Sequence, residues 1–435
     1  MAYRCRVSFV SVPAAGTPPL RDTPEQIEEA TRALAAGTGP IAIDTERASA
    51  YRYNDRAFLI QLRRRGAGTF LIDPEAQPTA AARMSEVVNS ADWILHAAHT
   101  DLPCLMALGW HPQRLHDTQI AAQILGAERI GLSGLLEDFF GIEVPKDKGN
   151  ADWSRRPLNA EMLNYAALDV EWLIEIHTLC IRELAEMGRT EWYSQECAHV
   201  LASATALTAP DWTSLKGLSS LREPLSRKVA HDLWEARDQL ARHRDLSPET
   251  ILRSRDIVAI AGHVVDDPNA ALKQLRFCLH RSRVRLAPRA RRRFTEVLSD
   301  ALTSAPYDLE LEHYRAPRHS SPGIPDHKIW SQEYPRAAAY ADAILSAADD
   351  VADNLQIRLD TIVTRRNLRK AAWACWLAEA SHAYDGAADP LAEWEDLLGA
   401  QWERLGLRPW QVEVLLNATL PAVAGVYSGD YSFWA

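Results

Sequence analysis

The stretch IAIDTE at residues 41–46 decides how the first half of this 435-residue chain is interpreted. It begins with an apolar run rich in β-branched residues and ends in acids, which is typical of a buried strand. Side chains two apart on a strand share one face of the sheet. Asp44 and Glu46 are therefore predicted to point together into whatever cleft lies at that end of the strand.

Two later segments carry acids in comparable settings. The apolar run WILH at 93–96 leads to Asp101, which opens a helix-like stretch at 102–106. A carboxylate is favoured there by the partial positive charge of a helix N-terminus. Residues 161–169 have helical periodicity, and Tyr165 and Asp169 are four apart, so they are predicted to share a helix face.

Acids gathered in this way need a counter-charge, because neighbouring carboxylates raise each other's pKa. Oxygen ligands favour Mg²⁺ or Mn²⁺, and no Cys or His group in the sequence has the spacing of a zinc site. Two such ions roughly 3.5–4 Å apart can activate a water and stabilise the leaving oxygen of a phosphodiester. We expect two divalent metal ions and assign the catalytic residues as Asp44, Glu46, Asp101, Tyr165 and Asp169, with Tyr165 orienting the water.

These segments resemble the three motifs of the DEDD superfamily of 3′–5′ exonucleases, and the whole chain resembles the bacterial ribonuclease D family. The runs FLIQL at 58–62, LHDT at 115–118 and ADWSRRPL at 151–158 are similar to further segments of that family. Tyr165, four residues before the last aspartate, indicates the tyrosine subclass, because Asn164 stands where the other subclass has histidine. The resemblance implies removal of nucleoside 5′-monophosphates from RNA 3′ ends, including those of tRNA precursors.

The resemblance also implies how the acids share the ions. Asp44, Glu46 and Asp169 would hold one ion, and Asp44 with Asp101 would hold the second. Trp153 is expected in the core rather than stacked on a base, whereas Asp117 and Lys146 could each be a cleft residue or a member of a local ion pair. The residues predicted to contact nucleic acid are Gln61, His96, Lys146, Arg281, Arg283 and Arg285.

The chain is long enough for two or three domains. Strand-like runs alternate with helical stretches from residue 22 to 205, which indicates an α/β exonuclease domain after a loose lead-in at 1–21. The resemblance implies a ribonuclease H-like domain with a mixed sheet. All-α units follow: residues 206–300 resemble an HRDC domain, residues 301–330 read as a proline-rich linker, and residues 331–435 resemble a second HRDC copy, stretched by an acidic segment near 379–396.

The arginines between Arg276 and Arg293 form the main basic cluster of a chain whose net charge is −10. Charge runs are usually solvated helix faces, yet arginines neutralise phosphates and supply sequence-independent affinity. This stretch is the best candidate for holding a structured RNA while its free 3′ end enters the acidic cleft.

Two other functions stay open: a DNA 3′–5′ exonuclease of the proofreading kind, and a non-catalytic RNA-binding scaffold. A helicase is excluded because the sequence has no Gly-x-x-x-x-Gly-Lys-Ser/Thr loop. The six cysteines lack paired short spacings, and no apolar run reaches the roughly 18 residues of a membrane span. We expect a monomeric cytoplasmic protein with reduced cysteines and no membrane segment.

Overall fold

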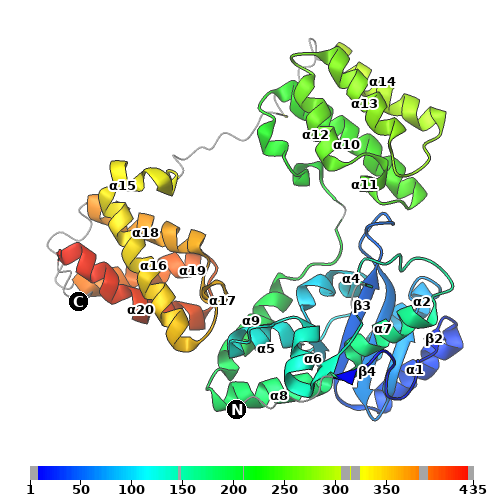
Figure 1. Ribbon diagram of the computed structural model, residues 1–435, viewed down its shortest axis with the longest axis horizontal. Coiled ribbons are helices and arrows are strands. Elements are labelled where there is room, and N and C mark those ends of the chain that lie inside the picture. The colour runs from blue at the N-terminus through cyan, green and yellow to red at the C-terminus, as the bar shows by residue number, and fades with distance from the viewer. Residues whose placement is uncertain are drawn as a thin grey trace.

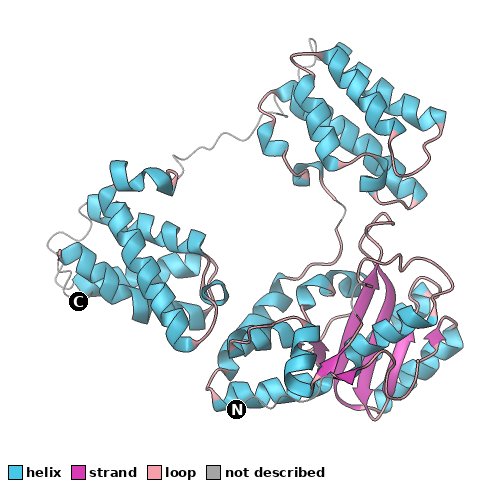
Figure 2. Cartoon of the chain, viewed as in Figure 1, coloured by secondary structure: helices cyan, strands magenta, loops and turns pink. Residues whose placement is uncertain are grey.

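The structure is a computed structural model and describes residues 8–145, 148–208, 210–304, 314, 324–381 and 390–429. Three units follow one another along the chain (Figure 1). Among the described residues only the first unit contains strands, and the next two are helical (Figure 2). The predicted fold class, an α/β domain followed by all-α units, is therefore confirmed.

The first unit is built around a six-stranded mixed sheet with the order β2-β5-β4-β3-β6-β7. Strand β4 runs antiparallel to β3 and β5, and the other neighbours are parallel. The four strands predicted near residues 41, 57, 69 and 93 are all present. The strands are β1 (Ser8–Phe9), β2 (Leu20–Arg21), β3 (Thr38–Arg47), β4 (Ala57–Arg65), β5 (Gly68–Ile72), β6 (Trp93–Leu95), β7 (Leu115–Asp117) and β8 (Ile142–Glu143).

The lead-in is more ordered than predicted. Strand β2 pairs in parallel with β5 at the edge of the main sheet, and β1 pairs in parallel with β8 in a separate two-stranded sheet. Each of these strands has only two residues, which is too short to produce an alternating pattern in the sequence. Within the predicted lead-in at 1–21, the described residues therefore contain these two short strands, and residues 10–19 between them form neither helix nor strand.

Helices cover both faces of the main sheet. Ile41 and Ile43 pack in one core cluster with Leu34 of α1, whereas Ala42 packs in another with Val170 of α7. Helix α7 also contacts β4 and β5. The helices of this unit are α1 (Pro24–Ala36), α2 (Pro78–Arg83), α3 (Ser85–Val88), α4 (Leu102–Ala107), α5 (Thr118–Leu125), α6 (Leu132–Phe140), α7 (Ala160–Glu171), α8 (Leu173–Glu186) and α9 (Thr190–Ser203).

The middle unit has its own apolar core, formed by helices that residues 206–300 were expected to contain. Helix α10 begins with Pro224 at its first turn, where a missing N–H costs nothing, and ends at Asp245 in the left-handed region with φ 48°. The helices are α10 (Pro224–Arg244), α11 (Pro248–Ile251), α12 (Ser254–His263), α13 (Pro268–His280) and α14 (Pro288–Ser304).

The C-terminal unit is a second separate helical core, rich in tryptophan. The acidic segment near 379–396 is described only up to 381 and again from 390, and most of the predicted linker and the tail through Trp434 lie outside the described residues. The helices are α15 (Trp330–Glu333), α16 (Pro335–Leu355), α17 (Leu359–Ile362), α18 (Arg365–Ala380), α19 (Pro390–Arg404) and α20 (Pro409–Ser428).

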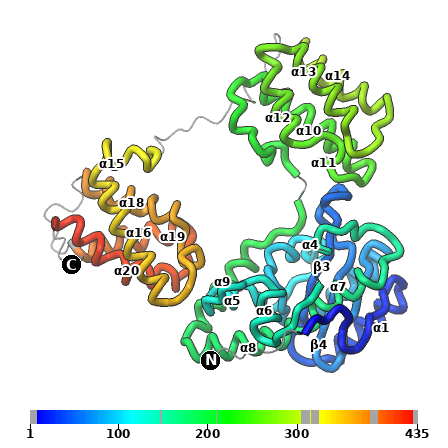
Figure 3. Tube along the Cα trace, in the orientation of Figure 1, coloured from blue at the N-terminus to red at the C-terminus, as the bar shows by residue number. Residues whose placement is uncertain are grey.

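Both helical units contact the first unit. The loop at 48–56, between β3 and β4, reaches the middle unit near α11 (Figure 3). The C-terminal unit packs on α5 and α9, where the Arg189 guanidinium donates to the carbonyls of Ile124 at 2.8 Å and Leu355 at 2.7 Å. Beside it, the rings of Trp192 and Trp410 stack with centroids 4.7 Å apart.

The described part of the chain contains no helix that is both long and apolar enough to cross a membrane. Five cysteines, at positions 104, 180, 197, 278 and 375, are free thiols, as expected, and Cys5 lies outside the described residues.

Candidate active site

Asp44 and Glu46 lie on the face of β3 that α7 covers. They alternate in step with Ala42, whose side chain packs against α7. Asp169 of α7 approaches the same face, and one ligand oxygen from each of the three carboxylates lies within 4.8 Å of the other two. The structure therefore brings together three of the four predicted acids.

Helix α7 carries both residues of the third segment. The side chain of Asn159 caps it by accepting a hydrogen bond from the Met162 N–H at 2.9 Å. Tyr165 lies one turn before Asp169, and its ring is 6.3 Å from that of Trp153, at an interplanar angle of 42°. Trp153 is fully buried, which confirms its predicted place in the core.

Asp101 lies beside this group rather than within it. It begins α4, as predicted for a residue at a helix N-terminus, and its side chain is almost fully buried. The hydroxyl of Thr45 donates to Oδ1 at 2.5 Å and the hydroxyl of Thr100 donates to Oδ2 at 2.8 Å. Both carboxylate oxygens are thus held from the turn before α4 and from β3.

The acids of the site resist ionisation together. Burial raises the pKa of Asp44 and Glu46 well above the usual range, and the neighbouring carboxylates raise it further. Burial and the charge of Asp101 raise the pKa of Asp169 to about 8. Burial also raises the pKa of Asp101, while the nearby Arg47 guanidinium opposes that increase. A bound cation would remove the repulsion that these shifts reflect.

The surroundings of Gln61 indicate whether the side chains of the site fit a metal ion. It pairs with Asp44 across β3 and β4, so both side chains occupy the same face of the sheet. Gln61 is fully buried, and within the described residues neither its amide nitrogen nor its amide oxygen has a hydrogen-bond partner. An amide beside three convergent carboxylates can bond to a water of hydrated Mg²⁺ or Mn²⁺, so the donor set fits such an ion. Gln61 is fully buried in this structure, and its contact with nucleic acid stays a prediction.

The neighbouring polar residues have local partners. His96 is partly exposed and its Nδ1 lies 2.9 Å from the Thr118 hydroxyl, while burial lowers its pKa. Asp117 is buried and accepts hydrogen bonds from four backbone N–H groups, those of residues 97, 98, 119 and 120. Asp117 therefore caps α5 and also holds the backbone turn at residues 97 and 98. Lys146 lies outside the described residues.

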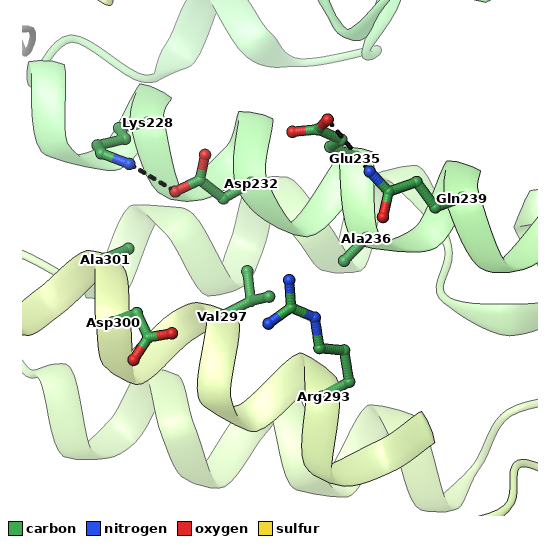
Figure 4. A pocket seen from close by; sticks show the side chains of 9 residues that line it. All are labelled: Lys228, Asp232, Glu235, Ala236, Gln239, Arg293, Val297, Asp300 and Ala301. Carbon is green, nitrogen blue, oxygen red and sulfur yellow. Dashed lines mark hydrogen bonds and ion pairs between the residues drawn. The ribbon is translucent and has the colours of Figure 1, made fainter. Parts of the chain in front are cut away.

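The predicted RNA-binding arginines differ in their surroundings. Arg281, Arg283 and Arg285 are exposed in the segment between α13 and α14. Arg293 instead projects from α14 toward α10, where it lines a pocket of mixed charge together with Asp232 (Figure 4). The other lining residues are Lys228, Glu235, Ala236, Gln239, Val297, Asp300 and Ala301. Arg293 is exposed as well, but it lines this pocket together with Asp232, Glu235 and Asp300. It is consequently a weaker candidate for phosphate contact than Arg281, Arg283 and Arg285.

Arg47 was missed by the sequence interpretation. It directly follows Glu46, and its Nη1 lies 3.8 Å from Oδ1 of Asp101. The spacing of acids in the sequence carries no information about this pairing, because the two residues are 54 positions apart and meet only in the folded sheet.

Two segments of the chain match known protein families. Residues 20–184 match a family described as 3′–5′ exonuclease, and residues 323–423 match one described as 3′ to 5′ exonuclease C-terminal domain. Ribonuclease D from Xanthomonas oryzae pv. oryzae is 31% identical over 286 residues, which cover 64% of this chain and 75% of that protein. Ribonuclease D from Sphingobium indicum is 30% identical over 230 residues, covering 51% of this chain and 58% of that relative's length.

Solved structures resemble more of the chain. A protein from Bifidobacterium adolescentis has a TM-score of 0.77 and 27% identity, and the alignment covers 96% of this chain and 99% of that one. RNase D from Escherichia coli has a TM-score of 0.60 and 22% identity, with 83% and 91% of the two chains covered. At that identity the second likeness concerns the fold. The first extends through both helical units as well as the α/β unit.

Proposed function

The chain belongs to the ribonuclease D family, and we propose on that premise that it is a metal-dependent 3′–5′ exoribonuclease. The observation that supports this best is the convergence of Asp44, Glu46 and Asp169, whose ligand oxygens lie within 4.8 Å of one another. Tyr165, one turn before Asp169 on α7, supplies a hydroxyl on the same helix. A non-catalytic scaffold would have no reason to keep three mutually repelling acids together.

The proposed reaction is hydrolysis of the terminal phosphodiester. Asp44, Glu46 and Asp169 would hold one divalent ion, and Asp44 with Asp101 would hold a second. Such ions lower the pKa of water and stabilise charge on the leaving oxygen. Tyr165 would hydrogen-bond the attacking water and orient it in line with the leaving 3′ oxygen. Each event would release one nucleoside 5′-monophosphate and leave a shortened strand with a new 3′ hydroxyl.

We propose two ions because of the position of Asp101. Its carboxylate is buried, and its charge contributes to the raised pKa of Asp44 and of Asp169. An ion held by the three convergent acids alone would leave this fourth carboxylate with two hydroxyl donors and, at 3.8 Å, the Arg47 guanidinium as its ion-pair partner. A second divalent ion shared with Asp44 would compensate it directly.

The proposed substrate is RNA with a free 3′ end, and the family resemblance favours tRNA precursors. The exposed Arg281, Arg283 and Arg285 would contact phosphates of the RNA body while its 3′ end occupies the acidic site. Replacing all three with Gln should weaken binding of a tRNA-like substrate. The slope of the logarithm of the binding constant against the logarithm of the salt concentration should become shallower by roughly 0.7–0.9 per lost contact. Arg182→Gln, which changes an exposed arginine of α8, is the control. Equal affinity and salt slope in the triple variant would remove this stretch from the RNA interface.

Matched oligonucleotides test the proposal itself. The full chain should shorten a 5′-labelled RNA one nucleotide at a time with Mg²⁺ or Mn²⁺, and EDTA or a 3′-phosphate on the RNA should stop the reaction. A DNA strand of the same sequence tests the second candidate, a DNA 3′–5′ exonuclease, which the same acids could also support. Preferential hydrolysis of the DNA strand would favour that candidate. Failure to hydrolyse either strand would contradict the assignment of a nuclease.

A further inference from the structure

Arg47 occupies a position between two acids at the end of β3. Its Nη1 lies 3.8 Å from Oδ1 of Asp101 and 3.8 Å from Oδ2 of Asp55. The same nitrogen donates a hydrogen bond to the backbone carbonyl of Thr100, the residue before Asp101. One partly buried guanidinium therefore joins the strand that carries Asp44 to the turn that carries Asp101.

The position of Asp101 depends on such contacts because Asp101 comes from a different layer of the fold. Asp44 faces α7, whereas α4, which Asp101 begins, packs in the core cluster on the opposite face of the sheet. Only hydrogen bonds from Thr45 and Thr100 and the Arg47 guanidinium tie its carboxylate to the site among the contacts of the described residues. These contacts fix how far Asp101 lies from Asp44.

Asp55, the second acid beside Arg47, belongs to the loop at 48–56, and this loop is anchored on the middle unit. Two parallel bonds join the Arg56 guanidinium to the Asp245 carboxylate, at 3.1 and 3.0 Å. Asp245 sits at the left-handed end of α10, and its Oδ1 also lies within hydrogen-bond distance of the Tyr53 N–H, at 3.4 Å. This bidentate pair has the geometry that makes arginine–carboxylate contacts strong.

Tyr53 adds an apolar anchor to the same loop. Its ring packs against the core of the middle unit, and its hydroxyl donates to Asp238 of α10 at 2.7 Å. The backbone N–H of Ser247 donates to the Tyr51 carbonyl at 3.0 Å, so the main chain of the loop is held as well. An uninterrupted series of contacts thus runs from α10, through the loop, to the turn that carries Asp101.

We propose that Arg47 is a positioning residue for Asp101, and that docking of the middle unit on the loop at 48–56 keeps Arg47 in place. This inference rests on the proposed metal-dependent nuclease site. Residues that orient a metal ligand typically change metal affinity or activity by about 10–100-fold when they are replaced. The RNA-holding unit and the metal site would accordingly be mechanically linked.

Mn²⁺ binding to the full chain without RNA is the measurement that tests the role of Arg47. Arg47→Gln should raise the Mn²⁺ concentration needed for half-saturation by about 10-fold or more, as for other residues that orient ligands. Arg47→Lys should recover part of the affinity, because it keeps the charge but not the planar fork. Arg114→Gln, which breaks an exposed ion pair with Asp92, should bind Mn²⁺ like the wild type.

Hydrolysis of a short RNA separates positioning from RNA contact. The Arg47 variants should need more Mn²⁺ for half-maximal kcat, with KM for RNA unchanged. Mn²⁺ binding by Arg47→Gln and Arg47→Lys that equals that of the wild type would overturn the proposal. Tighter Mn²⁺ binding would overturn it as well, because removal of a guanidinium that merely competes with cations would have that effect. A raised KM at unchanged metal dependence would also overturn it and make Arg47 a phosphate contact.

Asp245→Asn tests the link to the middle unit. Asparagine keeps the size of the side chain and tolerates the left-handed backbone, while the ion pairs with the loop lose their charge. The Mn²⁺ half-saturation should shift in the same direction as in Arg47→Gln but by a smaller factor, at an unchanged melting temperature. No shift would overturn the part of the proposal that concerns the middle unit. A wild type that binds Mn²⁺ without hydrolysing RNA would instead contradict the proposed function and leave the binding comparison valid.

Discussion

Asp169 shows most clearly how burial and neighbouring acids affect ionisation in the site. Its pKa is raised to about 8 by burial and by the charge of Asp101, and the pKa of Asp44 and of Glu46 is raised for the same kinds of reason. At neutral pH the metal-free site therefore holds protons that a divalent ion must displace. Metal binding and proton release should be linked in this protein.

The first prediction follows from the sign of this shift. The usual pKa of an aspartate is 3.8, so the folded protein retains the Asp169 proton between about pH 4 and pH 8 while the unfolded chain has lost it. The raised pKa of folded Asp169 therefore stabilises the protein fully below about pH 4. This stabilisation is lost progressively as the pH rises from about 4 through about 8. In EDTA the melting temperature should fall from about pH 6 to pH 8.5, and Asp169→Asn should reduce that slope. Equal slopes in the two proteins would contradict a raised pKa.

The second prediction concerns the Tyr165 hydroxyl. Tyr165→Phe keeps the ring beside Trp153 and removes only the group expected to orient the water. The rate of the chemical step should fall by about 10²–10⁴-fold, the range for positioned acid–base groups, with KM for RNA and the melting temperature unchanged. Single-turnover kinetics at saturating Mn²⁺ measure this. A higher KM at unchanged kcat would exclude Tyr165 from the reacting centre.

Much of the site at this scale could be predicted from local sequence. Asp44 and Glu46 follow from the two-residue repeat of a strand, and Tyr165 and Asp169 from the four-residue spacing of a helix. The separate position of Asp101 and the full burial of Gln61 could not be predicted, because both depend on which layers cover each face of the sheet. Contacts between residues distant in sequence leave no periodic signal.

Among the elements, the turn at 97–101 has the most influence on the site, because it carries Asp101. Ala97 adopts the left-handed backbone with φ 58°, and the N–H groups of Ala97 and Ala98 both bond to the buried Asp117. The same carboxylate caps α5. The Asp117 side chain thus fixes both the turn at 97–101 and the start of α5.

The third prediction is that Asp117→Ala destabilises the protein. Losing a helix cap and leaving buried N–H groups unpaired should cost about 1–3 kcal/mol, measured by urea unfolding. The activity should fall as well, because the turn that holds Asp101 would loosen. Asp138→Ala breaks an exposed pair with Arg129 and should change stability by less than about 0.5 kcal/mol. A similar cost for the two variants would argue against a structural role for Asp117.

The elements themselves were predictable to different degrees. Strand β3 and its neighbour β4 stand out as apolar, β-branched runs, and α7 has clear helical periodicity. Strands β1 and β2 were not predicted, because they have two residues each and are defined by pairing with β8 and β5 rather than by composition. A short edge strand depends on its partner more than on its own sequence.

At the scale of the molecule, close contact between the first and the C-terminal units constrains Gly126. This residue ends α5 with φ +78°, and a Cβ added there would lie 2.0 Å from the carbonyl oxygen of Gln356. The chain therefore needs glycine at this position both for its backbone conformation and for the approach of another unit. Contacts of this kind could not be predicted from sequence, because nothing in the α5 segment indicates what packs on it.

The fourth prediction uses this clash. Gly126→Ala should separate the C-terminal unit from α5 and increase the radius of gyration measured by small-angle X-ray scattering. Gly188→Ala is the matched control: Gly188 has a similar φ of +70°, but an added Cβ would meet no atom within 4 Å. Both variants pay the cost of a left-handed alanine, so only the difference between them reports the contact. Indistinguishable scattering from the two variants would contradict the docked arrangement.

The fifth and most direct test of the central claim is Mn²⁺-dependent hydrolysis by Asp44→Asn. Asp44 is expected to touch both ions, so this substitution should reduce single-turnover hydrolysis of a 5′-labelled RNA by at least about 100-fold, the upper end of what residues that only orient a ligand contribute. Binding of the RNA and the melting temperature should remain close to those of the wild type. A wild-type enzyme that shortens the strand stepwise from its 3′ end, beside an inactive Asp44→Asn, is the predicted result. Near wild-type turnover by Asp44→Asn with Mn²⁺ would contradict the assignment of the acidic site.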